Sequence, residues 1–196
     1  MSQKIKEIIA ASIQVKQQLL ENEKIINTVN DCVAVIVKAF KDGNKVLFCG
    51  NGGSAADAQH LAAEFSGRFY IDRDALPAEA LHCNTSYLTA VGNDYSFDLI
   101  YARLIKGLGK KGDVLVGLST SGNSANIVNA FEVAHEKEMI TIGFTGLTGG
   151  LLKEISDHLL NVTSTDTPRI QESHILLGHI ICELVEEELF GNSAIN

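Results

Sequence analysis

The sequence of 196 residues lacks any long hydrophobic run. No stretch of about 18 consecutive apolar residues occurs, and the N-terminus has no short apolar segment like that of a secretory signal peptide. A low-complexity linker is also missing. We therefore expect one soluble, cytoplasmic domain. The 45% of hydrophobic residues are sufficient to build its core and leave apolar surface for contacts between subunits.

Positive charge is scarce as well. The chain has 16 Lys and Arg residues against 24 Asp and Glu residues, which gives a formal net charge of −8. Nucleic acid and anionic membranes are therefore not expected as main partners, because both attract basic surfaces. Because the chain is acidic overall, a bound anion has to be held by local hydrogen-bond donors and not by a positively charged surface.

The four cysteines lack the Cys-x-x-Cys spacing of a metal or redox motif. Cys32 and Cys49 fall in apolar, periodic segments. We expect all four, Cys83 and Cys182 included, to be reduced core residues of a cytosolic protein.

Two amphipathic helices are predicted before the first strand, over residues 3–21 and 23–41. Their apolar residues recur every three to four positions, as on one face of a helix. Two long helices ahead of the sheet exceed what one small domain needs. We therefore expect their apolar stripes to pack between subunits; the alternative is packing onto the chain's own sheet. The stripe of the second helix comprises Ile26, Val29, Val33, Ile36, Val37 and Phe40.

Short apolar runs alternate with helical patterns along the rest of the chain. Strands are predicted at 46–49, 78–81, 114–118, 140–145 and 159–162. Helices are predicted from 54, at 86–91 and 96–108, after 124, at 151–156 and at 168–190. Such alternation indicates an α/β protein with a central parallel sheet covered by helices on both faces.

The first strand runs into a glycine turn, Gly50-Asn51-Gly52-Gly53. Ser54 is predicted to cap the next helix, with Asp57 as the second member of an imperfect capping box. Glycines let a backbone approach a ligand closely, and the free N–H groups of a first helical turn attract anions. The turn matches neither the dinucleotide-binding GxGxxG motif nor a P-loop. It is therefore either a distinct anion site or a tight turn without a ligand.

A second strand–turn–helix unit carries four hydroxyl groups in six residues, on Ser119, Thr120, Ser121 and Ser124. Hydroxyl donors beside a helix start suit a phosphate monoester, and open α/β sheets bind ligands at the carboxyl ends of their strands. We expect a phosphate site here; the alternative is a solvated turn.

Few residues are suited to acid–base chemistry. His60 and Glu64 lie four apart on one helical face, as a metal pair, a base with its orienting group, or a surface pair. Gln171 and His179 share the last helix, about 12 Å apart along its axis. They can meet one ion only if their side chains converge.

Four segments together resemble one family: CGNGGSAADAQHLAAEFSGRF, VGNDYSF, GDVLVGLSTSGNS and RIQESHILLGHIICELVE. They are similar to the sugar isomerase (SIS) superfamily, specifically the bacterial phosphoheptose isomerases. The resemblance spans about residues 45–190. It implies an SIS-type three-layer αβα sandwich with a central parallel sheet, preceded by two N-terminal helices. It also implies a single SIS domain over residues 1–196, in a homotetramer whose N-terminal helices, about 3–41, pack in the oligomer.

The resemblance further implies an activity, the conversion of sedoheptulose 7-phosphate to D-glycero-D-manno-heptose 7-phosphate, a precursor of ADP-heptose and the lipopolysaccharide core. Glu64 and His179 would be the acid–base pair of an enediol mechanism. One zinc ion per chain is implied on His60, Glu64, Gln171 and His179. The implied substrate contacts are Asn51, Gly52, Gly53, Ser54, Glu64, Asn93, Asp94, Ser119, Thr120, Ser121, Ser124 and Gln171.

Two other functions fit SIS domains. One is a non-enzymatic tetramer that binds a replication initiator protein; that relative lacks the residues that this chain keeps as Glu64 and His179. The other is a sugar-phosphate sensor, which usually accompanies a DNA-binding module for which this chain leaves no room. The sequence departs from the family at Asn84, where members often have an acid.

Overall fold

The structure is a computed structural model that describes residues 1–191. A five-stranded, fully parallel sheet forms its middle layer, in the order β2-β1-β3-β4-β5. Residues 192–196 of the predicted domain lie outside the described residues. The strands are β1 (Val46–Gly50), β2 (Ala78–Ala80), β3 (Val114–Leu118), β4 (Ile140–Thr145) and β5 (His158–Asn161).

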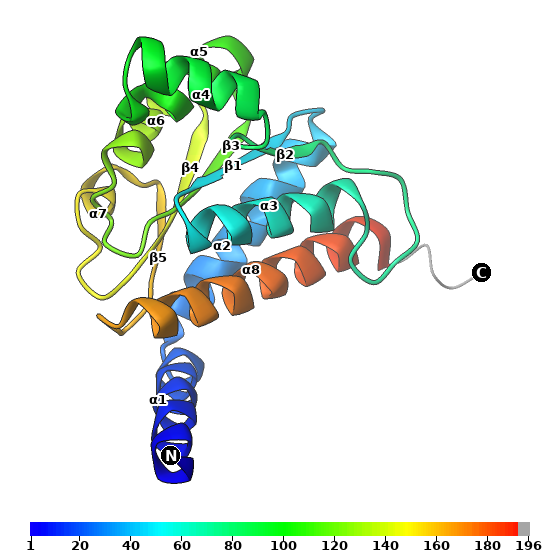
Figure 1. Cartoon of the computed structure of the whole chain (residues 1–196). Coiled ribbons are helices and arrows are strands. Elements are labelled where there is room, and N and C mark those ends of the chain that lie inside the picture. Colours follow the sequence, from blue (N-terminus) through cyan, green and yellow to red (C-terminus); the bar gives the residue numbers. More distant parts are fainter. Residues whose placement is uncertain (192–196) are drawn as a thin grey trace.

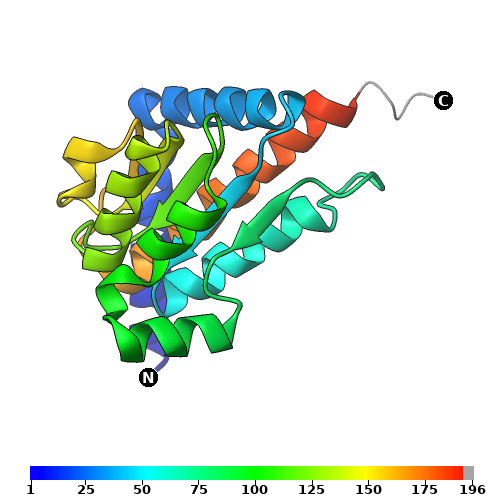
Figure 2. The ribbon, with the colours of Figure 1, turned by 90° about the horizontal axis from the view of Figure 1, so that it is seen from above.

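Helices cover both faces of this sheet (Figure 1). Alternate strand residues face opposite sides, so Phe48 and Val116 enter one core while Leu47 and Leu115 enter the other. The first core is covered by α2 (Glu23–Lys41), α3 (Gly53–Ser66) and α8 (Thr167–Phe190). The second is covered by α4 (Thr85–Asp94), the 3₁₀ turn Phe97–Leu99, α5 (Ile100–Leu108), α6 (Ala125–Glu136) and α7 (Leu152–Ile155). Figure 2 shows the same layers from above. The expected α/β sandwich is confirmed.

The apolar stripe of α2 packs onto its own chain, contrary to the expectation that it lies between subunits. Val29, Val33, Ile36 and Val37 are buried against the sheet and α8, Phe40 is partly buried, and Ile26 is 38% exposed. The structure favours the stated alternative for this stripe, because the sheet and α8 of the same chain bury most of it.

Helix α1 (Ser2–Leu20) projects from the rest of the molecule (Figure 1). Polar contacts join its middle to α8, where the Ser12 hydroxyl donates to Glu172 and the Ile8 carbonyl accepts from Arg169. Its apolar side chains are left open to solvent in a single chain: Ile5, Ile8, Ile9 and Ile13.

Several local predictions need correction. Helix α3 begins at Gly53 with Gly52 as its N-cap, so Ser54 lies inside the first turn and is not the cap. Gly52 fills that position because its φ of 57° is strained for any residue with a side chain. Cys83 is exposed, although the other three cysteines are buried as predicted.

The predicted break after residue 91 is also wrong, because α4 continues through Asp94. Asn84 begins this helix: its side-chain oxygen accepts the Tyr87 N–H at 3.0 Å. The asparagine at this position, where family members often have an acid, is therefore a suitable N-cap residue. Within residues 1–191, no helix is both long and apolar enough to cross a membrane.

Candidate active site

The glycine turn and the serine loop meet at one edge of the sheet. Strands β1 and β3 are parallel neighbours, and their last residues, Gly50 and Leu118, are paired in register. The segments that follow, 51–53 and 119–124, therefore leave the sheet side by side. This is the position where open α/β sheets bind ligands.

A pair of amides ties these two segments together. The Asn51 side chain donates to Asn126 Oδ1 at 2.8 Å, and Asn126 donates back to Asn51 Oδ1 at 2.8 Å. Asn126 is 2% exposed, in the first turn of α6. The sequence analysis missed Asn126, because the pair joins residues 75 positions apart.

The serine loop gathers its hydroxyl groups as predicted. The Oγ atoms of Ser119 and Ser124 are 2.9 Å apart, and Ser121 Oγ lies 3.5 Å from Ser119 Oγ. Ser124 directly precedes α6, whose first N–H groups add further donors. Thr120 and Ser121 also line a hollow together with the polar residues Asn123, Thr148, Ser164, Thr165 and Thr167 and the apolar residues Leu147 and Ile170. Such a concentration of neutral donors can hold an anion without a basic residue.

The acid–base candidates form a second group, further along α3. His60 Nε2 lies 3.0 Å from Glu64 Oε1, and His179 Nε2 of α8 lies 3.0 Å from His60 Nε2. Each residue places one donor atom within 4.8 Å of the others. The four-residue spacing predicts the first contact, whereas local sequence gives no sign of the second, and only the family resemblance placed His179 in this group.

Close packing of α3 on α8 brings His179 to this group. The two helices run in the same direction and Gly178 lies against Leu61, which brings His60, the residue before Leu61, to His179, the residue after Gly178. A Cβ atom on Gly178 would lie 2.5 Å from Leu61 Cδ1, closer than real Cβ atoms come. The absence of a side chain at Gly178 therefore sets the helix separation.

Gln171 lies at the other end of this helix pair, beside the glycine turn. A Cβ atom on Gly53 would be 2.6 Å from Gln171 Nε2, so the glycine makes room for the amide. Gly53 and His60 are seven residues apart on α3, about 10 Å along its axis. The position of Gln171 beside the glycine turn agrees with its predicted role as a substrate contact. Its role as a metal ligand stays a prediction.

Asp57 is a further acid in this region that was predicted only as part of a helix cap. Its Oδ2 is buried and has no hydrogen-bond partner among the described residues. Burial raises the pKa of Asp57, while the nearby His60 and His179 oppose that rise. Its position three residues before His60 is the signal that could have placed it on the site face.

The structure leaves two predicted contacts apart from the others. Asn93 and Asp94 end α4, which covers the opposite face of the sheet from α3. Both are exposed, and Asn93 Nδ2 donates to Asp94 Oδ1 at 2.9 Å. Their contact with a sugar therefore stays a prediction.

Comparison with known proteins assigns the family. The sequence pattern of the SIS domain matches residues 8–146, which is more than half of the chain. The chain belongs to the SIS domain family. This SIS protein is 54% identical over 187 residues to phosphoheptose isomerase 2 of Campylobacter jejuni, covering 95% of this chain and 93% of the relative.

Solved structures agree with this assignment. A phosphoheptose isomerase from Neisseria gonorrhoeae matches with a TM-score of 0.89 and 42% identity, covering 95% of this chain and 98% of that one. One from Francisella tularensis matches with a TM-score of 0.90 and 37% identity, covering 94% and 97%. Within the SIS family, the chain therefore groups with the phosphoheptose isomerases, and it is an enzyme. The non-enzymatic alternative is set aside.

Proposed function

We propose that this SIS protein interconverts sedoheptulose 7-phosphate and D-glycero-D-manno-heptose 7-phosphate. The observation that carries the proposal is the meeting of Glu64 and His179 in one group, on a chain that aligns with phosphoheptose isomerases over nearly its whole length. Carboxylates and imidazoles are common general acids and bases in enzymes.

The substrate would lie along the α3–α8 pair from the loops toward His60. In this arrangement Ser119, Thr120, Ser121 and Ser124 hold the phosphate, supported by their clustering at the start of α6. The sugar hydroxyls would then contact the glycine turn and Gln171, which lie against each other. The proposed sugar contacts are Asn51, Gly52, Gly53, Ser54, Glu64, Asn93, Asp94 and Gln171.

The reaction moves one proton between neighbouring carbons and one between their oxygens. In the proposed mechanism Glu64 takes the proton from C1 of the ketose and returns it to C2 of the enediol. His179 donates a proton to O2 and accepts the one that leaves O1, so no external acid or base is consumed. An imidazole can do both because it titrates near neutrality.

The group of His60, Glu64 and His179 also suits a zinc ion. Two imidazoles and a carboxylate are a common donor set for Zn²⁺, and the 3.0 Å between the two Nε2 atoms is compatible with Zn–N bonds of about 2.0–2.1 Å. Gln171 is proposed as a further ligand. When bound, zinc would polarise the substrate oxygens. A carboxylate on zinc is a weaker base, so either Glu64 would alternate between ligand and base or the metal would be mainly structural.

The wider setting follows from the same assignment. The heptose phosphate would enter ADP-heptose and lipopolysaccharide core synthesis in the cytoplasm. We further propose a homotetramer, supported by the exposed apolar residues of α1.

An isomerase assay tests the proposed reaction. Purified protein should convert sedoheptulose 7-phosphate to the aldose, and His179→Asn should lower the rate by about 10²–10⁴-fold while keeping the fold. His158→Asn is the matched control, because His158 begins β5 at the opposite edge of the sheet. Binding of the sugar phosphate without conversion by wild type would instead indicate a sensor.

Elemental analysis tests the metal. Protein purified without chelator should carry about one zinc per chain, and His60→Ala should lose most of it. Full activity of metal-free wild type would refute a catalytic zinc.

A further inference from the structure

One buried carboxylate fastens the loop after α3 to α8. Glu186 is 2% exposed, and its Oε1 accepts the Phe69 N–H at 3.0 Å. Its Oε2 accepts the N–H groups of Tyr70 and Ile71 at 2.6 and 2.8 Å. The fourth donor is Arg73 Nε, 2.9 Å from Oε1. Each carboxylate oxygen thus has two partners, and three successive residues of the loop are held at fixed positions on α8.

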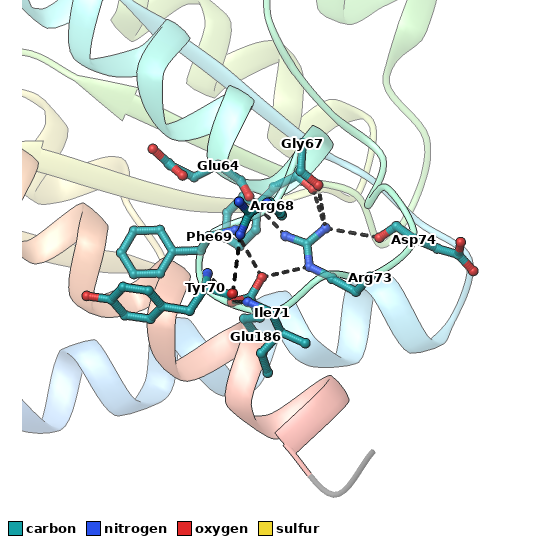
Figure 3. Close-up of polar contacts among 10 residues, drawn as sticks. Glu64, Gly67, Arg68, Phe69, Tyr70, Ile71, Arg73, Asp74 and Glu186 are labelled. Atoms are coloured by element: carbon teal, nitrogen blue, oxygen red, sulfur yellow. Dashed lines mark hydrogen bonds and ion pairs between the residues drawn. The ribbon is translucent and has the colours of Figure 1, made fainter. Parts of the chain in front are cut away.

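The partner of this carboxylate caps α3. The Arg73 side chain is 2% exposed, and its Nη2 donates to the Glu64 carbonyl at 2.9 Å. Its Nη1 donates to the carbonyls of Phe65 and Gly67 at 2.8 and 3.1 Å (Figure 3). The last carbonyl groups of a helix have no N–H donor within the helix, and here the guanidinium supplies the missing donors. It thereby holds the final turn of α3 in its helical geometry.

The Arg73–Glu186 pair is connected in two ways to the acid–base group of His60, Glu64 and His179. Figure 3 shows the carboxylate of Glu64 pointing away from Arg73, although its carbonyl is bound by the guanidinium. At the other end, the Phe69 ring packs on the His179 imidazole with centroids 5.8 Å apart, and the Tyr70 ring supports Phe69 at 4.5 Å. The Arg73–Glu186 pair therefore fixes the backbone at Glu64 and the Phe69 ring that packs on the His179 imidazole.

We propose that Arg73 and Glu186 are positioning residues: they set the last turn of α3 and the Phe69 ring, and through these they orient the Glu64 carboxylate and the His179 imidazole. Neither residue is among the proposed substrate contacts. The link to catalysis rests on the proposed function, whereas the link to the orientation of His179 does not.

The rival explanation is that the buried pair only stabilises the fold. The chain offers a matched control in Asp113, which is 1% exposed and accepts the backbone N–H groups of Lys45 and Lys110 as well as Lys45 Nζ. Asp113 precedes β3 and so lies at the edge of the sheet away from the site. Asp113→Asn and Glu186→Gln therefore make the same chemical change in similar surroundings.

The first measurement separates kcat from KM at a temperature where circular dichroism shows all variants folded. Glu186→Gln and Phe69→Leu should lower kcat by about 10- to 100-fold, as expected from a small misplacement of reacting groups. KM for the sugar phosphate should change less than about threefold, because the phosphate is held at the distant serine loop. Asp113→Asn should leave both constants within about twofold. A folded Glu186→Gln with wild-type kcat overturns the proposal.

The second measurement does not depend on activity. The imidazole of His179 is observed by NMR in protein with ¹³C-labelled histidine, and its signal is assigned from its loss in His179→Asn. Phe69→Leu removes the ring current and should shift this signal. Glu186→Gln should shift it in the same direction and Asp113→Asn should not. An unmoved signal in Glu186→Gln contradicts the proposal even if its activity is low.

Two further outcomes are informative. If Glu186→Gln does not fold, Arg73→Lys retains a positive charge beside Glu186 and loses the fork that binds the α3 carbonyls. It should give the same kcat loss and signal shift, and wild-type behaviour of this variant overturns the proposal. If wild type converts no sugar phosphate, the proposed function fails, while the NMR comparison still decides the orientation of His179.

Discussion

At the scale of single residues, the proposed phosphate site consists of hydroxyl groups and the first N–H groups of α6. Ser119 is 4% exposed and its hydroxyl lies 2.9 Å from that of Ser124, so the two present a paired set of donors. No lysine or arginine is among the residues that line the adjoining hollow. If this loop holds the phosphate as proposed, each hydroxyl should contribute a large share of the binding.

Ser119→Ala and Ser124→Ala should each weaken binding of the sugar phosphate by about tenfold or more. A hydrogen bond to a charged group contributes about 1.5–3 kcal/mol, which corresponds to that factor. Isothermal titration in the His179→Asn background measures affinity without turnover. Thr28→Ala is the control, because its hydroxyl donates to the Lys24 carbonyl on α2. Unchanged affinity in both serine variants would exclude the loop as the phosphate site.

His174 should make stability depend on pH. Burial lowers its pKa to about 4, with the hydrogen bond to the Thr145 carbonyl as a smaller opposing effect. Between pH 6.5 and about 4, His174 is therefore protonated in the unfolded chain but stays neutral in the folded chain. The free energy of unfolding should fall by about 1.4 kcal/mol for each pH unit in this window and gain nothing further from His174 above it.

Urea unfolding at pH 7.5 and 5.5, at one protein concentration, measures this dependence. His174→Gln keeps a donor for the Thr145 carbonyl and cannot titrate, so it should lose less stability between the two pH values than wild type. An equal loss in both proteins would show that His174 is not the group responsible.

At the scale of elements, the distance between α3 and α8 decides whether the site exists. Gly178→Ala places a Cβ atom 2.5 Å from Leu61 Cδ1 and should push the helices apart. We expect a loss of about 1–3 kcal/mol in the free energy of unfolding, as for overpacked cores, together with lower activity. Gly92→Ala is the control: it lies in α4, where a Cβ atom would meet nothing within 4 Å. Full activity and stability of Gly178→Ala would show that the helices need not approach so closely.

At the scale of the whole molecule, the apolar face of α1 needs a partner. Ile5 is 53%, Ile9 54% and Ile13 61% exposed. This face continues into a groove lined by residues of α1, α2 and α8, among them Leu20, Ile26, Leu176, Ile180 and Leu184. Contiguous apolar surface of this kind is typical of contacts between subunits.

Light scattering should therefore report a tetramer for wild type. Ile9→Asp combined with Ile13→Asp should shift the protein to smaller species, because a charge buried in an apolar contact is costly. Lys6→Asp changes the charge of the same helix by a similar amount and should leave the tetramer intact. A wild-type monomer at micromolar concentration would contradict the proposed assembly.

The sequence by itself determined the elements and the chemistry of the loops. Short apolar runs located the five strands, because strands of a parallel sheet are covered on both faces. Helical periodicity located the long helices, because burial on one side imposes a spacing that depends only on local geometry. The hydroxyl cluster at 119–124 and the pair of His60 and Glu64 were visible for the same reason, since their members are neighbours along the chain.

Only the tertiary structure decided which distant residues meet. His60 and His179 are 119 positions apart, and Arg73 and Glu186 are 113 apart. The path of the chain between such residues depends on the packing of every element, and no local pattern records it. For the same reason the sequence showed the apolar stripe of α2 but not its partner, because a stripe specifies that it is buried without specifying which surface covers it.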